Sequence, residues 1–155
     1  MISLEKNNID KVFKELEIMN SNPEYNLLSK NKRTVTISDI KAEYAKTKIS
    51  KMNRMLIKKG LQYIGLIDFT LKSSLDNLPK VDLFVIHKKF QGSTIAEQAY
   101  YYFEGMLYGN KTNACRLVVC KRNEAAVRFW KKVGYKTYEE TIRNGKVCLF
   151  MEKRY

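Results

Sequence analysis

One stretch of sequence decides the fold: Leu83-Phe-Val-Ile-His-Lys-Lys-Phe-Gln-Gly-Ser-Thr-Ile-Ala96. It begins within an apolar run from Val81 to Ile86, which is typical of a central strand buried on both faces. A polar turn then leads into a helix that we expect to end at Gly109-Asn110. Because the turn contains a glycine, it leaves backbone N–H groups at the positive end of the helix dipole, where a phosphate group can bind. The stretch matches neither the Walker pattern nor the dinucleotide pattern G-x-G-x-x-G.

Downstream of this stretch, the sequence predicts a buried strand over residues 114–120 and a helix over residues 123–133, which Gly134 ends. The chain then forms a hairpin around the turn Asn144-Gly145. The strand, helix and strand from Val81 to Cys120 form a crossover connection, which implies a parallel pair of strands within a mixed sheet. The core face of the crossover helix is predicted to contain Ile95, Ala99, Tyr102, Phe103, Met106 and Leu107.

Upstream, a short first strand is followed by apolar residues at helical spacing from Ile9 to Met19, with Phe13 among them. A second helix is expected to begin at Thr36, since Asp39 completes a capping-box pattern. A hairpin then turns at Lys59-Gly60, and residues 72–79 form a loop. We expect one domain over residues 1–155, because a chain of 155 residues is the size of a single domain.

The charge of the chain is strongly positive but evenly distributed. The formal net charge is +13, with 15 basic and 9 acidic residues up to Lys80 and 14 and 7 after it. Such a field attracts a phosphorylated cofactor and repels a polycation. Because no segment concentrates the charge, a solvated basic surface is favoured over a nucleic-acid site.

Three cysteines without a C-x-x-C pattern predict neither a disulfide framework nor a metal site, and they fit the reducing cytoplasm. Acidic residues interrupt the N-terminal segment, so we expect no signal peptide. The sequence also contains no apolar window of 18 residues, so a membrane partner is not expected.

Two motifs resemble the GNAT superfamily of N-acetyltransferases. The segment ending Gln91-Gly-Ser-Thr-Ile-Ala96 is similar to the family's acetyl-CoA motif [QR]-x-x-G-x-[GA] after a strand. The segment Asn123-Glu-Ala-Ala-Val-Arg-Phe-Trp-Lys-Lys-Val-Gly-Tyr135 is similar to the family's N-x-x-A-x-x-F-[YW]-x-x-x-G-[FY] helix. The order and spacing of the two motifs also agree with the family over nearly the whole chain.

This resemblance implies an α/β (α+β) fold. Its mixed central sheet would have six to seven strands and about four flanking helices, with a splayed parallel pair at the cofactor site. The strand around Phe84 and Val85 would pair with the pantetheine arm of acetyl-CoA, and Asn123 would lie near its thiol end. The pyrophosphate would be held by Gln91, Gly92, Ser93, Thr94, Ile95 and Ala96.

Two residues depart from the family pattern. Thr94 replaces the usual glycine, and Trp130 replaces the tyrosine that protonates the leaving thiolate in many relatives. Trp130 is expected to be a packing residue, because an indole N–H is a poor acid. Tyr135 and Tyr138 are alternative proton donors.

The general base is not identified by any motif. Asp82 and Asp68 are candidates that could draw a proton from an ammonium group through water, although an exposed or hydrogen-bonded carboxylate at a sheet edge is favoured for each. His87 is the only histidine, and as a single residue beside two lysines it is more typical of a surface.

The resemblance implies transfer of an acetyl group from acetyl-CoA to a primary amine by direct attack in a ternary complex, without a metal. One alternative is a weak or inactive acyl-CoA-binding module of the same fold, and a more distant one is a nucleic-acid-binding protein. We expect the acceptor pocket to be built by the first two helices, the loop from Lys72 to Pro79 and the final hairpin. The aromatic run Tyr100 to Phe103 predicts core packing and a protein interface, and a homodimer is one such interface.

Overall fold

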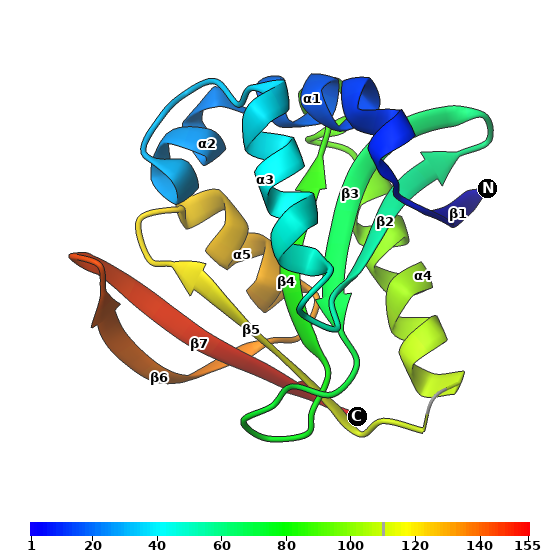
Figure 1. Cartoon of the computed structure of the whole chain (residues 1–155). Coiled ribbons are helices and arrows are strands. Elements are labelled where there is room, and N and C mark those ends of the chain that lie inside the picture. Colours follow the sequence, from blue (N-terminus) through cyan, green and yellow to red (C-terminus); the bar gives the residue numbers. More distant parts are fainter. Residues whose placement is uncertain (110) are drawn as a thin grey trace.

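The computed structural model describes residues 1–109 and 111–155. Its seven strands form one sheet in the order β1-β2-β3-β4-β5-β7-β6 (Figure 1). The strands are β1 (Ile2–Lys6), β2 (Asn53–Lys59), β3 (Gln62–Thr70), β4 (Lys80–Ile86), β5 (Ala114–Cys120), β6 (Lys136–Arg143) and β7 (Lys146–Arg154). The helices are α1 (Val12–Asn20), α2 (Pro23–Lys30), α3 (Ile37–Thr47), α4 (Ile95–Gly109) and α5 (Glu124–Lys132), with 3-10 turns at Ile9–Lys11 and Lys88–Phe90.

Helices cover both faces of the sheet and bury a separate core on each (Figure 1). Between the sheet and α1 and α3, Ile18 and Ile40 pack with Leu56 and Leu66. The opposite core lies beneath α4 and α5 and contains the largest buried side chains, including Tyr100, Phe103 and Tyr135. Both faces of the central strands are therefore apolar, as expected for strands inside a three-layer fold.

The parallel pair β4 and β5 is the irregular point of the sheet. The two strands are in register only at Lys80 with Arg116 and at Val81 with Leu117, and beyond these pairs they diverge. β4 also contains a β-bulge. Val81 pairs with Phe69 of β3. Leu83 pairs with the preceding residue of β3, so Asp82 is the extra residue of the bulge. The predicted mixed sheet with one splayed parallel pair is confirmed.

The predicted capping box is present, since Thr36 Oγ1 accepts a hydrogen bond from the Asp39 N–H and the Thr36 N–H donates one to Asp39 Oδ2. Gly134, the residue predicted to end the helix, follows α5 with a positive φ of 108°.

Helix α2 is an addition to the predicted elements. Its first residue is Pro23, which fits the first turn of a helix because that position needs no N–H donor, although the same residue also fits a helix end.

Three predictions of buried apolar residues are wrong, and the first is Ile9, which is 43% exposed in the 3-10 turn before α1. Phe13 is 68% exposed, because Val12 and Glu15 occupy the inner face of α1. Tyr102 is 47% exposed, and Tyr100 is buried in its place. Tyr100 lies three residues before Phe103 and therefore shares its helix face, whereas Tyr102 is turned about 100° away.

Asn110, which was predicted to end α4 together with Gly109, lies outside the described residues. Among the helices that are described, none has the length and apolar composition to cross a membrane.

Candidate active site

A cleft of about 430 Å³ opens where β4 and β5 diverge. We call it the interstrand cleft. One wall is formed by Phe84, Val85 and Ile86 of β4, and another by the turn and first residues of α4. Helices α2 and α5, each with its N-cap residue, form the remaining walls of the cleft. Their lining residues are Asn22, Glu24, Tyr25, Leu28, Asn123, Ala125, Ala126, Phe129 and Trp130.

The turn before α4 carries unpaired backbone donors, and of its residues Gly92 and Ser93 line this cleft whereas Thr94 and Ile95 do not. Within the described residues, the N–H groups of Gly92, Ser93 and Thr94 donate no hydrogen bond to the protein. The Ile95 N–H is 3.3 Å from Ser93 Oγ. Gly92 has a φ of 78°, a left-handed conformation that favours glycine. Free N–H groups at the start of a 15-residue helix form a site suited to an anion.

Two side chains of the predicted pyrophosphate segment hold the turn in place. Gln91 Nε2 donates to Asn22 Oδ1 at 2.6 Å and to the Ile86 carbonyl at 2.7 Å, which ties the turn to α2 and β4. Thr94 Oγ1 accepts a hydrogen bond from Gln98 Nε2 at 3.1 Å. The threonine that departs from the family pattern thus has its hydroxyl engaged within the first turn of α4.

Aromatic rings form the apolar wall of the cleft. Phe84 stacks on Phe129 at a ring separation of 5.4 Å, and Trp130 contacts Phe84 edge-on at 5.6 Å. Trp130 is only 7% exposed and also packs against Tyr100 and Tyr135. These contacts fit the expected packing role of Trp130.

The two tyrosines considered as proton donors do not line the cleft. Tyr135 is 2% exposed behind Trp130, with its hydroxyl 3.0 Å from that of Tyr100. Burial and the neighbouring Cys115 and Tyr100 raise the pKa of Tyr135 far above its ordinary value, so it holds its proton. Tyr138 lies on β6 beneath the guanidinium of Arg116, at 4.5 Å.

Asn123 is the N-cap of α5 and borders the cleft. Its Oδ1 accepts a hydrogen bond from the Ala126 N–H at 3.2 Å. The cap therefore fixes the side chain and leaves its amide Nδ2 as the free donor.

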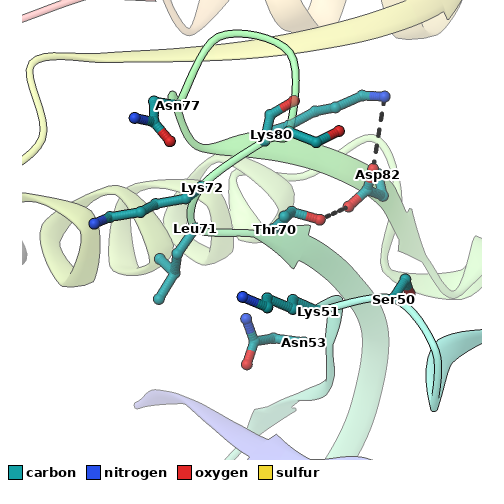
Figure 2. A pocket seen from close by; sticks show the side chains of 11 residues that line it. Ser50, Lys51, Asn53, Thr70, Leu71, Lys72, Asn77, Lys80 and Asp82 are labelled. Carbon is teal, nitrogen blue, oxygen red and sulfur yellow. Dashed lines mark hydrogen bonds and ion pairs between the residues drawn. The ribbon is translucent and has the colours of Figure 1, made fainter.

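Asp82, in the bulge of β4, lies beside a second and larger pocket of about 890 Å³ (Figure 2). Its Oδ2 accepts a hydrogen bond from Thr70 Oγ1 at 2.8 Å, and its Oδ1 is 3.8 Å from Lys80 Nζ. The side chain is 22% exposed. Burial raises the pKa of Asp82 above its ordinary value, although Thr70 and Lys80 act in the opposite direction. Asp82 is two residues, or about 7 Å along the strand, from Phe84 of the interstrand cleft.

We call this second site the lysine pocket. Its remaining lining comes from the segment between α3 and β2, from the loop between β3 and β4, and from the first residues of β2 and β4. These residues are Ser50, Lys51, Asn53, Leu71, Lys72, Ser73, Ser74, Asn77 and Lys80. The predicted loop thus contributes Lys72 and its neighbours to a pocket, whereas the contributions of Lys51, Lys80 and Thr70 were not predicted.

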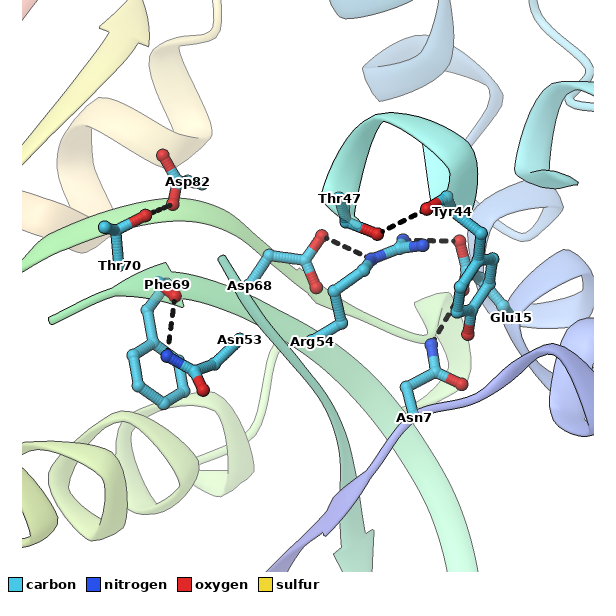
Figure 3. Close-up of polar contacts among 10 residues, drawn as sticks. All are labelled: Asn7, Glu15, Tyr44, Thr47, Asn53, Arg54, Asp68, Phe69, Thr70 and Asp82. Carbon is cyan, nitrogen blue, oxygen red and sulfur yellow. Dashed lines mark hydrogen bonds and ion pairs between the residues drawn. The ribbon is translucent and has the colours of Figure 1, made fainter. Parts of the chain in front are cut away.

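Asp68, the other candidate base, belongs to a buried ion cluster with Arg54 and Glu15 (Figure 3). Arg54 Nη2 is 2.8 Å from Glu15 Oε2, and Arg54 Nε is 3.3 Å from Asp68 Oδ2. Tyr44 covers the guanidinium at 4.6 Å. Burial raises the pKa of Asp68 to about 7, although Arg54 lowers it. Asp68 lines neither pocket, so its placement is that of a structural carboxylate.

The remaining candidates are apart from both pockets. His87 Nδ1 accepts a hydrogen bond from the Lys89 N–H at 3.2 Å, which makes it a cap of the turn after β4. All three cysteines are free. Within residues 1–109 and 111–155, no group of three or more His, Cys, Asp or Glu side chains is arranged to hold a metal ion.

Comparison with known proteins places this geometry in context. A family model described as an acetyltransferase (GNAT) domain matches residues 17–155. No curated protein sequence matches the chain.

Solved structures agree over nearly the whole length of the chain. An acetyltransferase from Thermus thermophilus has a TM-score of 0.84 at 17% identity, over 100% of this chain and 97% of that one. The PaiA N-acetyltransferase of Thermoplasma acidophilum, solved with coenzyme A, has a TM-score of 0.70 at 14% identity, with 100% and 99% covered. A spermidine N-acetyltransferase from Vibrio cholerae, solved with CoA and spermine, has a TM-score of 0.75 at 13% identity, with 99% and 95% covered.

Proposed function

The chain belongs to the GNAT acetyltransferase family, and we propose that it acts as a single domain over residues 1–155 that acetylates a primary amine. Membership of this family makes the protein an acyltransferase that uses acetyl-CoA. The amine and the mechanism are the parts that we propose. The solved relatives that contain CoA support binding of the same co-substrate here.

We assign acetyl-CoA to the interstrand cleft. The diphosphate would accept hydrogen bonds from the N–H groups of Gly92, Ser93 and Thr94, with Ile95 and Ala96 beginning the helix behind them. The pantetheine arm would lie beside Phe84 and Val85, where β4 has no neighbouring strand. Asn123 would donate its amide near the thiol end.

The reaction that fits this arrangement is direct attack in a ternary complex. Asp82 would take a proton from the ammonium group of the acceptor through water, and its raised pKa suits a base that must also release that proton. The amine nitrogen would then bond to the thioester carbon, with a backbone N–H of β4 stabilising the oxyanion. The carbon–sulfur bond would break as the second proton of the nitrogen passes through water to the departing thiolate, so that coenzyme A leaves as the free thiol. Thr70 holds the carboxylate of Asp82 in one orientation.

The observation that carries this proposal is the set of free N–H groups at Gly92, Ser93 and Thr94, next to a cleft between splayed strands. Calorimetric titration with acetyl-CoA tests the cofactor site, and release of free thiol in the presence of a panel of amines tests the transfer. Saturable binding with amine-dependent thiol release is expected. Binding without release from any amine would instead support the alternative of a binding module.

Two further expectations belong to this proposal. The three free thiols support a reducing compartment such as the cytoplasm. Exposed Tyr101, Tyr102 and Tyr108 on α4 are consistent with a homodimer interface, which sedimentation measurements would test.

A further inference from the structure

We propose that the acceptor is a primary amine that also carries an anionic group, a carboxylate or a phosphate, which binds in the lysine pocket. This inference rests on the proposed function and specifies its substrate. The pocket adjoins Asp82, so a molecule that occupies it can present its amine to that carboxylate.

The charges that line the lysine pocket are unbalanced. Lys51 and Lys72 form no ion pair or side-chain hydrogen bond with any described residue. Lys80 is only loosely paired with Asp82, at 3.8 Å. Asp82 is the only acidic side chain among the described lining residues. A site with several ammonium groups and one carboxylate matches a ligand that has one amine and one anionic group.

Uncharged hydrogen-bond donors in the lysine pocket also suit an anionic group of the acceptor. Asn53 and Asn77 line the pocket together with three serine hydroxyls. Figure 2 shows Lys51, Asn53, Asn77 and Lys80 among the side chains that line the pocket. Ammonium, amide and hydroxyl donors together are the usual partners of carboxylate and phosphate oxygens.

The phosphates of acetyl-CoA do not explain these lysines. Lys80 begins β4 and Ile86 ends it, so the two are separated by about 20 Å along the strand. The free N–H groups that suit a diphosphate lie beyond Ile86, at the far end of β4. The lysines of the pocket are therefore available to another anion, and on the proposed mechanism the acceptor is the molecule that approaches from the side of Asp82.

The same charges exclude polyamines as good acceptors. A polycation in the pocket would place its additional ammonium groups near Lys51, Lys72 and Lys80, where like charges repel. The net charge of +13 also opposes the approach of such a molecule to the enzyme.

Matched acceptor pairs test the proposal. The pairs are 4-aminobutanoate with 4-aminobutanamide, and 2-aminoethyl phosphate with ethanolamine, with spermidine as the polycation. We expect kcat/KM, measured by thiol release, to be at least tenfold higher for the anionic member of at least one pair and lowest for spermidine. The pair with the larger ratio identifies the anionic group as a carboxylate or a phosphate.

Variants of the pocket give a second measurement. In Lys51→Met and Lys72→Met, we expect KM for the preferred anionic acceptor to rise about tenfold, because a charge-assisted hydrogen bond is lost. KM for acetyl-CoA should not change, and the ratio of kcat/KM between the anionic acceptor and its neutral partner should fall about tenfold. Lys41→Met, on the exposed face of α3, is the matched control, and all three lysines are exposed, so the variants should fold.

The outcomes separate this inference from the proposed function. Equal or better use of neutral amines or spermidine overturns the anionic acceptor but leaves the acetyltransferase intact. A pocket variant that slows neutral and anionic amines equally also overturns it. Absence of thiol release with every amine, when acetyl-CoA binds normally, overturns the proposed function and this inference together.

Discussion

At the scale of single residues, Gly92 tests the position of the cofactor. Its φ of 78° and the open space around its Cα leave room for a ligand close to the backbone. Gly92→Glu would place a negative charge at the proposed diphosphate site, and we expect binding of acetyl-CoA to weaken at least 100-fold in calorimetry.

Gly60→Glu is the control for this prediction. Gly60 also has a positive φ, 60°, and open space, but it lies in the turn between β2 and β3. The Gly60→Glu variant therefore has the same backbone strain and the same added charge as Gly92→Glu, but its new side chain does not contact the interstrand cleft. Equal affinity of the Gly92 variant and the control would remove the turn before α4 from the cofactor site.

Asp82 tests the proposed proton transfer. Asp82→Asn keeps an acceptor for the Thr70 hydroxyl but removes the base, so we expect kcat to fall by about 100-fold or more with KM for acetyl-CoA unchanged. The wild-type rate should fall as the pH decreases through the raised pKa of Asp82. The variant should lose this dependence and follow only the deprotonation of the amine.

The exposed Asp10→Asn variant serves as the control for Asp82→Asn. It should keep the wild-type rate and pH profile. A pH profile in Asp82→Asn identical to that of the wild type would show that another group accepts the proton.

The positions of some candidate site residues follow from local sequence, whereas the positions of others depend on the tertiary fold. Gly92 and Asn123 could be placed because a turn and a helix cap are local structures whose chemistry depends on neighbouring residues. Asp82 was only one of two candidate carboxylates, because the bulge that distinguishes it depends on pairing with β3. Tyr135 lies behind Trp130, and this placement depends on packing between distant elements.

At the scale of secondary structure elements, the hairpins and α3 were predictable because turn residues and a capping box define their ends. Helix α2 was not predicted, since its eight residues carry a weak apolar pattern and begin at a proline. Its omission also concealed Asn22 and Tyr25, which border the interstrand cleft. The lysine pocket likewise combines residues from three separate segments that only the tertiary fold brings together.

The contact between β3 and β4 gives a prediction at this scale. A Cβ on Gly65 would lie 2.5 Å from the Val85 carbonyl oxygen and 2.9 Å from Ile86 Cδ1. Gly65→Ala must therefore push the two strands apart at the wall of the cleft, and we expect it to lower the free energy of unfolding by about 3 kcal/mol.

Gly105→Ala is the comparison variant, and we expect it to change the free energy of unfolding in the opposite direction. Gly105 is exposed within α4 and has no atom near an added Cβ, so we expect a gain of about 0.5 to 1 kcal/mol from helix propensity. Urea denaturation measures the change in the free energy of unfolding for both variants. A Gly65 variant as stable as the wild type would contradict the close approach of β3 to β4.

At the scale of the whole molecule, the buried ion cluster links stability to pH. The pKa of Asp68 is raised from 3.8 to about 7 in the folded protein, chiefly by burial. Between these values the folded state binds a proton that the unfolded state has lost, so the free energy of unfolding falls as the pH rises from about 4 to about 7. This contribution is fully present below pH 4, and its slope is at most about 1.4 kcal/mol per pH unit.

Asp68→Asn should remove that contribution. The difference in unfolding free energy between wild type and variant should change with pH in urea denaturation at pH 4.5, 5.5 and 6.5, and Asp10→Asn should show no such change. The groups that interact with Asp68 are Arg54, Glu15, Tyr25, Tyr44 and Asp82. A difference independent of pH would mean that Asp68 is ionised in the folded protein throughout this range.

The junction of only two register pairs between β4 and β5 has a consequence for the motion of the free enzyme. Beyond it, the amides of these two strands that face the gap lack the shelter of a neighbouring strand, so they should exchange with deuterium faster than those of β2 and β3. A bound thioester arm would occupy that gap and slow their exchange. On the proposed placement of acetyl-CoA, the sheet of this enzyme would be completed by its own substrate, which would act as an eighth strand for as long as it stays bound.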